Sequence, residues 1–222
     1  MFMKALSAGL LGSLLAWNVA SAGIISVTGD TLEIAPPPSV EWETLESSDH
    51  VFVFQESANV ALATPLEMDV IPFQNNSTGL YDDGALGVQA TWKGDLGVGT
   101  YDSFYFHADK QGANVTFVGS VKFSAEIVGI SFRQNLNPTR PPFGNSDTAY
   151  PTGSTKNYEL TREDCWFSIS SDRRTLSFSA YVPHDLDQLR IVTAVSAEVP
   201  SPSSLCIFAL GLSGMLFPAR RR

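Results

Sequence analysis

The sequence predicts an all-β domain, an antiparallel β-sandwich of jelly-roll-like type, between two short terminal segments of a different character. Apolar and polar residues alternate with a period of two over several stretches, and turn-forming residues separate these stretches. No part of the central region keeps a helical period over three turns. Such alternation is typical of strands that face a core on one side and solvent on the other.

The clearest alternation lies at residues 114–123 and 175–182, where Val, Phe, Leu and Ala alternate with Ser, Thr, Asn and Lys. Further strands are expected at residues 50–55, 87–92, 102–107, 126–133, 164–169 and 189–195. Turn signals separate them at residues 82–84, 93–95, 110–112 and 171–173.

Two segments interrupt the strand pattern. Residues 134–153 contain four prolines and form the longest irregular stretch, so they are the first place to expect a binding loop. Phe143 in this stretch either contacts a ligand or pins the loop to the domain. Residues 34–48 are rich in Pro and Glu and are expected to form a mobile connection.

The N-terminal segment has the three parts of a secretory signal peptide. Lys4 supplies one positive charge, an apolar run too short to span a bilayer follows, and Ala20 and Ala22 give an A-x-A site before Gly23. We expect signal peptidase to cleave after Ala22, once the Sec translocon has exported the chain. A retained anchor helix is the alternative.

The C-terminal segment combines a proline motif, an apolar run and a cluster of arginines. The two prolines of the motif prevent a helix from continuing out of the domain. A helix over residues 203–219 would be about 26 Å long, against about 30 Å for a hydrocarbon core. The terminal arginines favour the cytoplasmic side, which leaves the domain outside. The motif is Val199, Pro200, Ser201, Pro202, Ser203 and Ser204, and the cluster is Arg220, Arg221 and Arg222.

This order of features resembles the PEP-CTERM sorting signal of Gram-negative bacteria, with Ser201 in place of the Glu that is usual between the prolines. The resemblance implies that an exosortase-type membrane transpeptidase recognises the tail and removes it near the motif. Together, the two terminal segments and the strand pattern between them divide the chain into a signal peptide at 1–22, a β-sandwich domain at 23–198 and a sorting signal at 199–222. An uncleaved tail, which would anchor a periplasmic protein in the membrane, is the alternative.

The charge of the domain argues against nucleic acid as a partner. Residues 23–199 contain all 23 acidic residues and 10 of the 14 basic ones, so their net charge is 10 − 23 = −13. This charge repels a phosphate backbone. Cys165 alternates with Phe167 and Ile169, which predicts a buried cysteine rather than a reactive one.

The motifs of common enzymes are missing from the sequence. It contains no Gly-x-Ser-x-Gly and no His-Glu-x-x-His pattern. Of the three histidines, His107 and His184 are interpreted as ordinary surface or partly buried residues. Loop carboxylates leave a carbohydrate-active enzyme open as an alternative, with Asp82, Asp83, Asp185 and Asp187 as candidates. No metal site or cofactor is expected. Calcium is a weaker alternative, with ligands among Asp82, Asp83, Asp95, Asp147 and Asp172.

Aromatic residues give the remaining indication of function. Trp166 lies on the polar phase of its predicted strand, opposite to Cys165 and Phe167, where a ring could stack on a sugar. The sequence thus favours a non-enzymatic protein of the cell envelope or extracellular matrix that associates with exopolysaccharide or mediates adhesion. Trp166 and Phe143 are its candidate glycan contacts.

Overall fold

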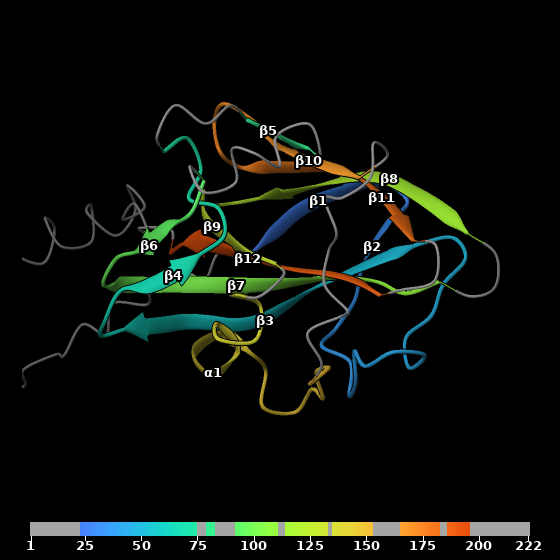
Figure 1. Ribbon diagram of the computed structural model, residues 1–222, viewed down its shortest axis with the longest axis horizontal. Coiled ribbons are helices and arrows are strands. Elements are labelled where there is room, and N and C mark those ends of the chain that lie inside the picture. Colours follow the sequence, from blue (N-terminus) through green and yellow to red (C-terminus); the bar gives the residue numbers. More distant parts are fainter. Residues whose placement is uncertain are drawn as a thin grey trace, which may run out of the picture. The chain divides into compact units, whose positions relative to one another are not determined.

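The computed structural model describes residues 23–74, 79–82, 92–110, 114–132, 135–152, 165–182 and 186–195. Strands dominate this part of the chain, which confirms the all-β fold class. Most of them form two five-stranded sheets, and two short strands form a separate ribbon. Figure 1 shows the two sheets as layers, one above the other.

The strands follow one another in a defined order within each sheet. The first sheet has the order β1 (Ile24–Gly29), β8 (Val115–Phe123), β11 (Thr175–Val182), β10 (Trp166–Ile169) and β5 (Leu80–Asp82). The second has the order β2 (Thr31–Glu33), β3 (Val51–Leu62), β7 (Gly99–Ala108), β12 (Asp187–Ala194) and β9 (Ile127–Ser131). The ribbon pairs β4 (Leu66–Met68) with β6 (Gly94–Leu96). Neighbouring strands are antiparallel apart from β2 and β3, which are parallel at one edge.

Phenylalanine rings join the two sheets across a shared core. Phe104 of β7 lies 4.8 Å from Phe123 of β8, measured between ring centres. Phe106 of β7 lies 4.8 Å from Phe178 of β11. Complete burial of such a side chain stabilises a fold by about 1.5–3 kcal/mol. The core between the sheets therefore holds the two layers together.

The chain passes from the first sheet to the second at Gly29. Its φ of 65° lies in the left-handed region, where glycine is favoured. A Cβ atom at this position would lie 2.2 Å from the backbone oxygen of Val118. The turn from β1 to β2 therefore requires glycine.

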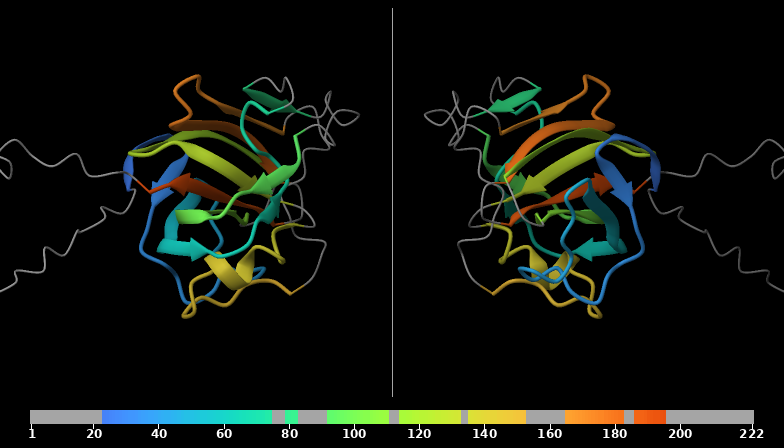
Figure 2. Two further views of the ribbon diagram at one scale, coloured as in Figure 1. Left: turned by 90° about the vertical axis from the view of Figure 1, so that its left-hand side faces the viewer. Right: turned by 90° about the vertical axis from the view of Figure 1, so that its right-hand side faces the viewer.

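The second sheet is buried on its outer face as well. Residues 34–48 and 135–152 lie over this face, and the short helix α1 (Arg140–Phe143) belongs to the later segment (Figure 2). The earlier segment is thus packed against the sheet, whereas its composition predicted a mobile connection. An apolar cluster joins both segments to β3 and β7, formed by Val40, Phe54, Tyr105, Leu136 and Tyr150.

Phe143 anchors the later segment to the domain. Its side chain is fully buried in a cluster with Met68 and Val192. The hydroxyl of Ser103 donates a hydrogen bond to the Phe143 carbonyl at 3.0 Å. A buried ring presents no face to a ligand, so the structure corrects the expectation of a glycan contact at Phe143 and assigns it the anchoring role.

Most of the expected strands correspond to observed ones. Those at 102–107, 114–123, 126–133, 164–169, 175–182 and 189–195 correspond to β7, β8, β9, β10, β11 and β12. The strand expected at 50–55 is β3, which continues to Leu62. Of the strand expected at 87–92, residues 87–91 lie outside the described residues and Trp92 is in a turn.

Residues 1–22 and 196–222, which include the expected signal peptide and sorting tail, also lie outside the described residues. Within the part that is described, no helix is both long enough and apolar enough to cross a membrane.

Candidate functional site

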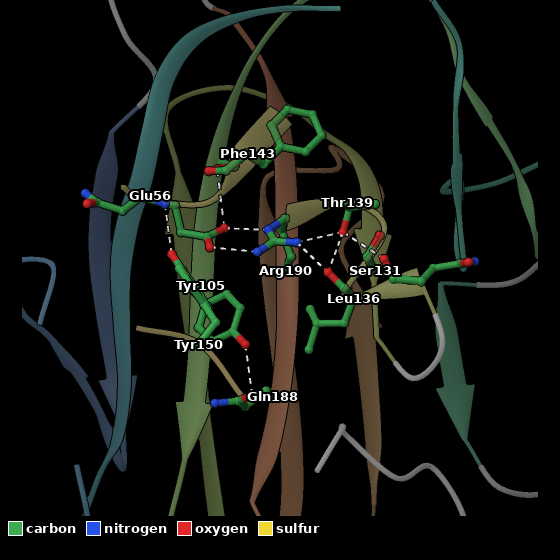
Figure 3. A network of polar contacts seen from close by, with 12 residues as sticks. Glu56, Tyr105, Ser131, Leu136, Thr139, Phe143, Tyr150, Gln188 and Arg190 are labelled. Carbon is green, nitrogen blue, oxygen red and sulfur yellow. Dashed lines mark hydrogen bonds and ion pairs between the residues drawn. The ribbon is translucent and has the colours of Figure 1, made fainter. Parts of the chain in front are cut away.

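A buried ion pair lies between the second sheet and the loop at 135–152 (Figure 3). The side chains of Arg190 on β12 and Glu56 on β3 have no exposed surface. Arg190 Nε donates to Glu56 Oε2 at 2.6 Å, and Arg190 Nη2 donates to Glu56 Oε1 at 2.8 Å. This two-point contact between planar groups compensates for the removal of both charges from water.

Glu56 lies at a β-bulge of β3. The register of β3 against β7 passes from Gln55 opposite Phe104 to Ser57 opposite Ser103, so Glu56 is the extra residue on β3. Its side chain has the same strand phase as Phe54, which packs against the covering loops, so its carboxylate faces the guanidinium of Arg190.

The same guanidinium holds the start of the loop. Arg190 Nη1 donates to the Leu136 carbonyl at 2.8 Å and to Thr139 Oγ1 at 2.6 Å. Thr139 Oγ1 lies within donating distance of the Asn135 carbonyl, at 2.8 Å. Asn135 Nδ2 in turn donates to Asp69 Oδ1, just beyond β4, at 2.9 Å. The loop is therefore attached to the domain by charge-assisted hydrogen bonds at several points.

A second chain of hydrogen bonds holds residues 34–48. The Tyr105 hydroxyl donates to Gln188 Oε1 at 2.8 Å, and Gln188 Nε2 donates to the Val40 carbonyl at 2.7 Å and to His107 Nδ1 at 2.9 Å. His107 Nε2 lies 3.1 Å from the Leu45 carbonyl. Because a carbonyl can only accept, the ring proton of His107 is on Nε2 and Nδ1 is an acceptor. The imidazole is therefore neutral.

Burial sets the protonation of this network. It lowers the pKa of His107 from 6.5 to about 4, against a smaller opposing effect of the Leu45 carbonyl. Burial also raises the pKa of Tyr105 and the pKa of Tyr150. The negative charge of the Glu56 carboxylate raises both further. Burial alone would lower the pKa of Arg190, but the Glu56 carboxylate outweighs it and the pKa is raised. None of these groups titrates near pH 7, so the network is suited to holding loops rather than to acid–base catalysis.

The first sheet has a face of hydroxyl side chains on the side away from the core. On β8 and β11, buried residues alternate with outward ones, most of which carry hydroxyl groups, although Val118 and Lys122 are also exposed on this side. We call this surface the hydroxyl face. It is formed by Thr28, Thr116, Ser120, Trp166, Ser168, Ser177 and Tyr181.

The strand register aligns hydroxyl groups across this face. Thr28, Ser120, Ser177 and Ser168 lie opposite one another on β1, β8, β11 and β10. The hydroxyls of Thr28 and Ser120 are hydrogen-bonded at 2.8 Å. Because neighbouring strands lie about 4.8 Å apart, this row extends over about 14 Å.

Two aromatic residues lie on the same face, Trp166 two residues along β10 from Ser168 and Tyr181 four residues along β11 from Ser177. Trp166 on β10 is half-buried, while its neighbours Cys165 and Phe167 are buried, so the predicted phase of Trp166 and the predicted burial of Cys165 are confirmed. Tyr181 on β11 lies diagonal to Trp166, two residues beyond its partner Ser179. Diagonal neighbours of this kind are about 7–8 Å apart, within reach of large rings. Asn114 Nδ2 donates to the Tyr181 hydroxyl at 2.9 Å.

The structure places the two described candidate carboxylates of a hydrolase in different sheets. Asp82 ends β5 in the first sheet, with its backbone opposite Trp166. Asp187 begins β12 in the second sheet and is buried. Asp83 and Asp185 lie outside the described residues.

The candidate calcium ligands are also dispersed. Asp95, Asp147 and Asp172 are exposed in three separate parts of the chain. In the described ranges, no group of three or more His, Cys, Asp or Glu side chains is arranged to hold a metal ion.

Comparisons of the chain with protein-family models, curated proteins and solved structures found no match. Function must therefore be inferred from the residues of the chain itself.

The sequence did not indicate the buried network. Tyr105, His107 and Arg190 alternate with apolar residues along their strands, a pattern that is typical of residues facing solvent. The large apolar residues on that same phase, such as Phe54, were the one signal that the face is covered.

The pKa of His107 predicts a dependence of stability on pH. Between pH 6.5 and pH 4 the imidazole of the unfolded chain gains a proton and that of the folded protein does not. The contribution of His107 to the free energy of unfolding should therefore be greatest above pH 6.5 and should fall by up to about 3 kcal/mol as the pH falls to 4. Below pH 4 this group should cause no further loss. Urea unfolding at a series of pH values measures this dependence of the free energy of unfolding on pH.

Two variants isolate this effect. His107→Gln should flatten the pH dependence over that range, whereas His50→Gln, at an exposed position, should retain the wild-type slope. An unchanged slope in His107→Gln would show that another group is responsible.

Proposed function

We propose that this protein is exported to the cell envelope or extracellular matrix, where it associates with a polysaccharide through the hydroxyl face without catalysing a reaction. The observation that carries the proposal is the position of Trp166 and Tyr181 on the same face as an aligned row of hydroxyl groups. Aromatic rings stack on the apolar faces of sugar rings, and hydroxyl groups exchange hydrogen bonds with sugar hydroxyls.

The shape of the face favours an extended ligand. Small molecules usually bind in concave sites, whereas this surface is the side of a sheet. The hydroxyl row crosses four neighbouring strands, so a polysaccharide chain has several points of contact along it. We infer that affinity arises from many weak contacts rather than from one deep pocket.

The terminal segments support a location outside the cytoplasm. The N-terminal pattern that ends at Ala22 favours export through the Sec translocon, and the tail from Val199 to Arg222 resembles a PEP-CTERM signal. Sorting by an exosortase-type transpeptidase would place the domain where exopolysaccharide occurs. We therefore propose a polysaccharide of the cell surface or matrix as the partner.

We also propose that the sandwich has jelly-roll-like connections. The chain changes sheet from β7 to β8, from β8 to β9 and from β11 to β12, as jelly rolls do between their two sheets. This wiring brings β8, β10 and β11 together and so forms the hydroxyl face from distant parts of the chain.

Removal of the Trp166 ring tests the glycan proposal. We expect Trp166→Ala to weaken binding of the full chain to its polysaccharide at least tenfold, because the stacking surface is lost. A glycan array identifies the ligand, and affinity electrophoresis measures the change. Trp42→Ala, which removes an exposed Trp outside the hydroxyl face, is the matched control and should bind as the wild type does. Equal losses in the two variants, or none in Trp166→Ala, would contradict the proposal.

Intact mass and cell fractionation in the native host test the proposed export and sorting. We expect the wild-type protein to lack residues 1–22 and the tail, and to occur at the cell surface or in the medium. A variant without Arg220, Arg221 and Arg222 should keep its tail and stay in the membrane. A wild-type protein that extends to Arg222 in the inner membrane would show that the tail is an ordinary anchor.

A further inference from the structure

A pocket of about 570 Å³ opens in the loop that covers the second sheet. Arg140 and Pro141 of α1 line it. Figure 1 shows α1 below the second sheet, on the side away from the first sheet. The volume of the pocket is within the range of about 300–1,000 Å³ that is usual for small-molecule sites. None of the described residues that line it is acidic. The polar ones are Asn137, Arg140, Asn145, Ser146, Thr148 and Thr152.

Alternating cations and rings extend from the buried ion pair to this pocket. Arg190 Cζ lies 5.5 Å from the ring centre of Tyr105, and Tyr105 meets Tyr150 edge-on at 5.2 Å. Arg140 Cζ lies 5.1 Å from the centre of the Tyr150 ring on the pocket side. Glu56 neutralises Arg190, whereas Arg140 has no carboxylate partner among the described residues. This cation–π contact holds the Arg140 guanidinium near the Tyr150 ring, and its N–H groups can still bind a ligand.

Asn145 adds a second donor to the pocket. Its Oδ1 accepts a hydrogen bond from the backbone N–H of Asp147 at 2.8 Å, which identifies this atom as the oxygen. Its backbone N–H donates to the Tyr150 hydroxyl at 2.9 Å. The group that the side chain can offer a ligand is therefore the Nδ2 donor. The Arg140 guanidinium and Asn145 Nδ2 are thus two donors in one pocket that have no acceptor among the described residues. They favour a ligand that is rich in acceptor oxygens.

We propose that this pocket binds the carboxylate of an acidic sugar, a hexuronate. The planar guanidinium of Arg140 can bind a carboxylate at two points. The additional donor of Asn145 suits the ring and hydroxyl oxygens that a sugar acid has and that sulfate and phosphate lack. Asn145 Nδ2 supplies a donor for the remaining sugar oxygens, whereas the Ser146 hydroxyl already donates toward Asp147 Oδ1 at 3.4 Å. The net charge of −13 on the domain disfavours a long polyanion, so the ligand is a single uronate unit. The site lies on the opposite sheet from the hydroxyl face, and the inference does not depend on glycan binding there.

Gly144 allows Arg140 to take up this position. A Cβ atom at residue 144 would lie 3.1 Å from Arg140 Cγ and 3.0 Å from the Arg140 carbonyl. Substitution of Gly144 by Ala would therefore displace the stem of Arg140. This gives a variant that disturbs the guanidinium without removing it.

Titration calorimetry of the full chain with glucuronate, glucose, sulfate and phosphate tests the inference. We expect saturable binding of glucuronate at one site, with glucose, sulfate and phosphate each at least tenfold weaker. Arg140→Met should lose at least tenfold in affinity, and Arg140→Lys and Gly144→Ala should lose less. Arg174→Met, which removes an exposed arginine at the other sheet, should bind as the wild type does.

Three outcomes would overturn the inference: equal affinity for glucuronate and glucose, tighter binding of sulfate or phosphate than of glucuronate, and wild-type affinity in Arg140→Met. If Arg140→Met does not fold, Asn145→Asp serves instead, because it places a negative charge on the wall of the pocket. That variant should lose binding, and retained affinity would equally overturn the inference. Loss of polysaccharide binding in Trp166→Ala with normal glucuronate binding would show that the two sites are separate.

Discussion

The buried guanidinium of Arg190 is the constraint on which the rest of this structure depends. Arginine keeps its proton at any ordinary pH, so its burial requires a counter-charge and an acceptor for each N–H group. The Glu56 carboxylate supplies the charge, and the Leu136 carbonyl and the Thr139 hydroxyl supply further acceptors. These acceptors come from a bulge and from a loop, so the sheet, the bulge and the loop must assemble together.

This arrangement makes the two sides of the sandwich different. The second sheet is covered on its outer face by residues 34–48 and 135–152, and the ion pair and the Tyr105–Gln188–His107 chain hold these segments in place. The first sheet carries the hydroxyl face on its outer side. Broad contact with a polymer suits the first side, whereas a pocket within an attached loop suits a small ligand on the second.

Local alternation in the sequence predicted part of this structure. The strands β8 and β11, the outward phase of Trp166 and the burial of Cys165 all depend on neighbours in the sequence or on strand phase. Strands of three residues, such as β2 and β6, have too few positions to show a period. The pairing of Glu56 with Arg190 joins positions 134 residues apart, and nothing in either local pattern specifies it. Phe143 illustrates the same limit, because its burial depends on a sheet formed elsewhere in the chain.

Hydrogen–deuterium exchange in Glu56→Gln tests the central claim most directly, since this near-isosteric change leaves Arg190 buried without a counter-charge. Loss of one partner of a buried pair costs about 3–5 kcal/mol, whereas an exposed pair contributes less than about 1 kcal/mol. The amides of Thr139, Phe143 and Gly144, which are hydrogen-bonded within the loop, should exchange much faster in Glu56→Gln. The amides of β8 and β11 should change less. Glu126→Gln, at the exposed pair with Arg173, should leave the loop as in the wild type. Unchanged protection of the loop in Glu56→Gln would contradict the account, because the ion pair would then not be what holds the loop.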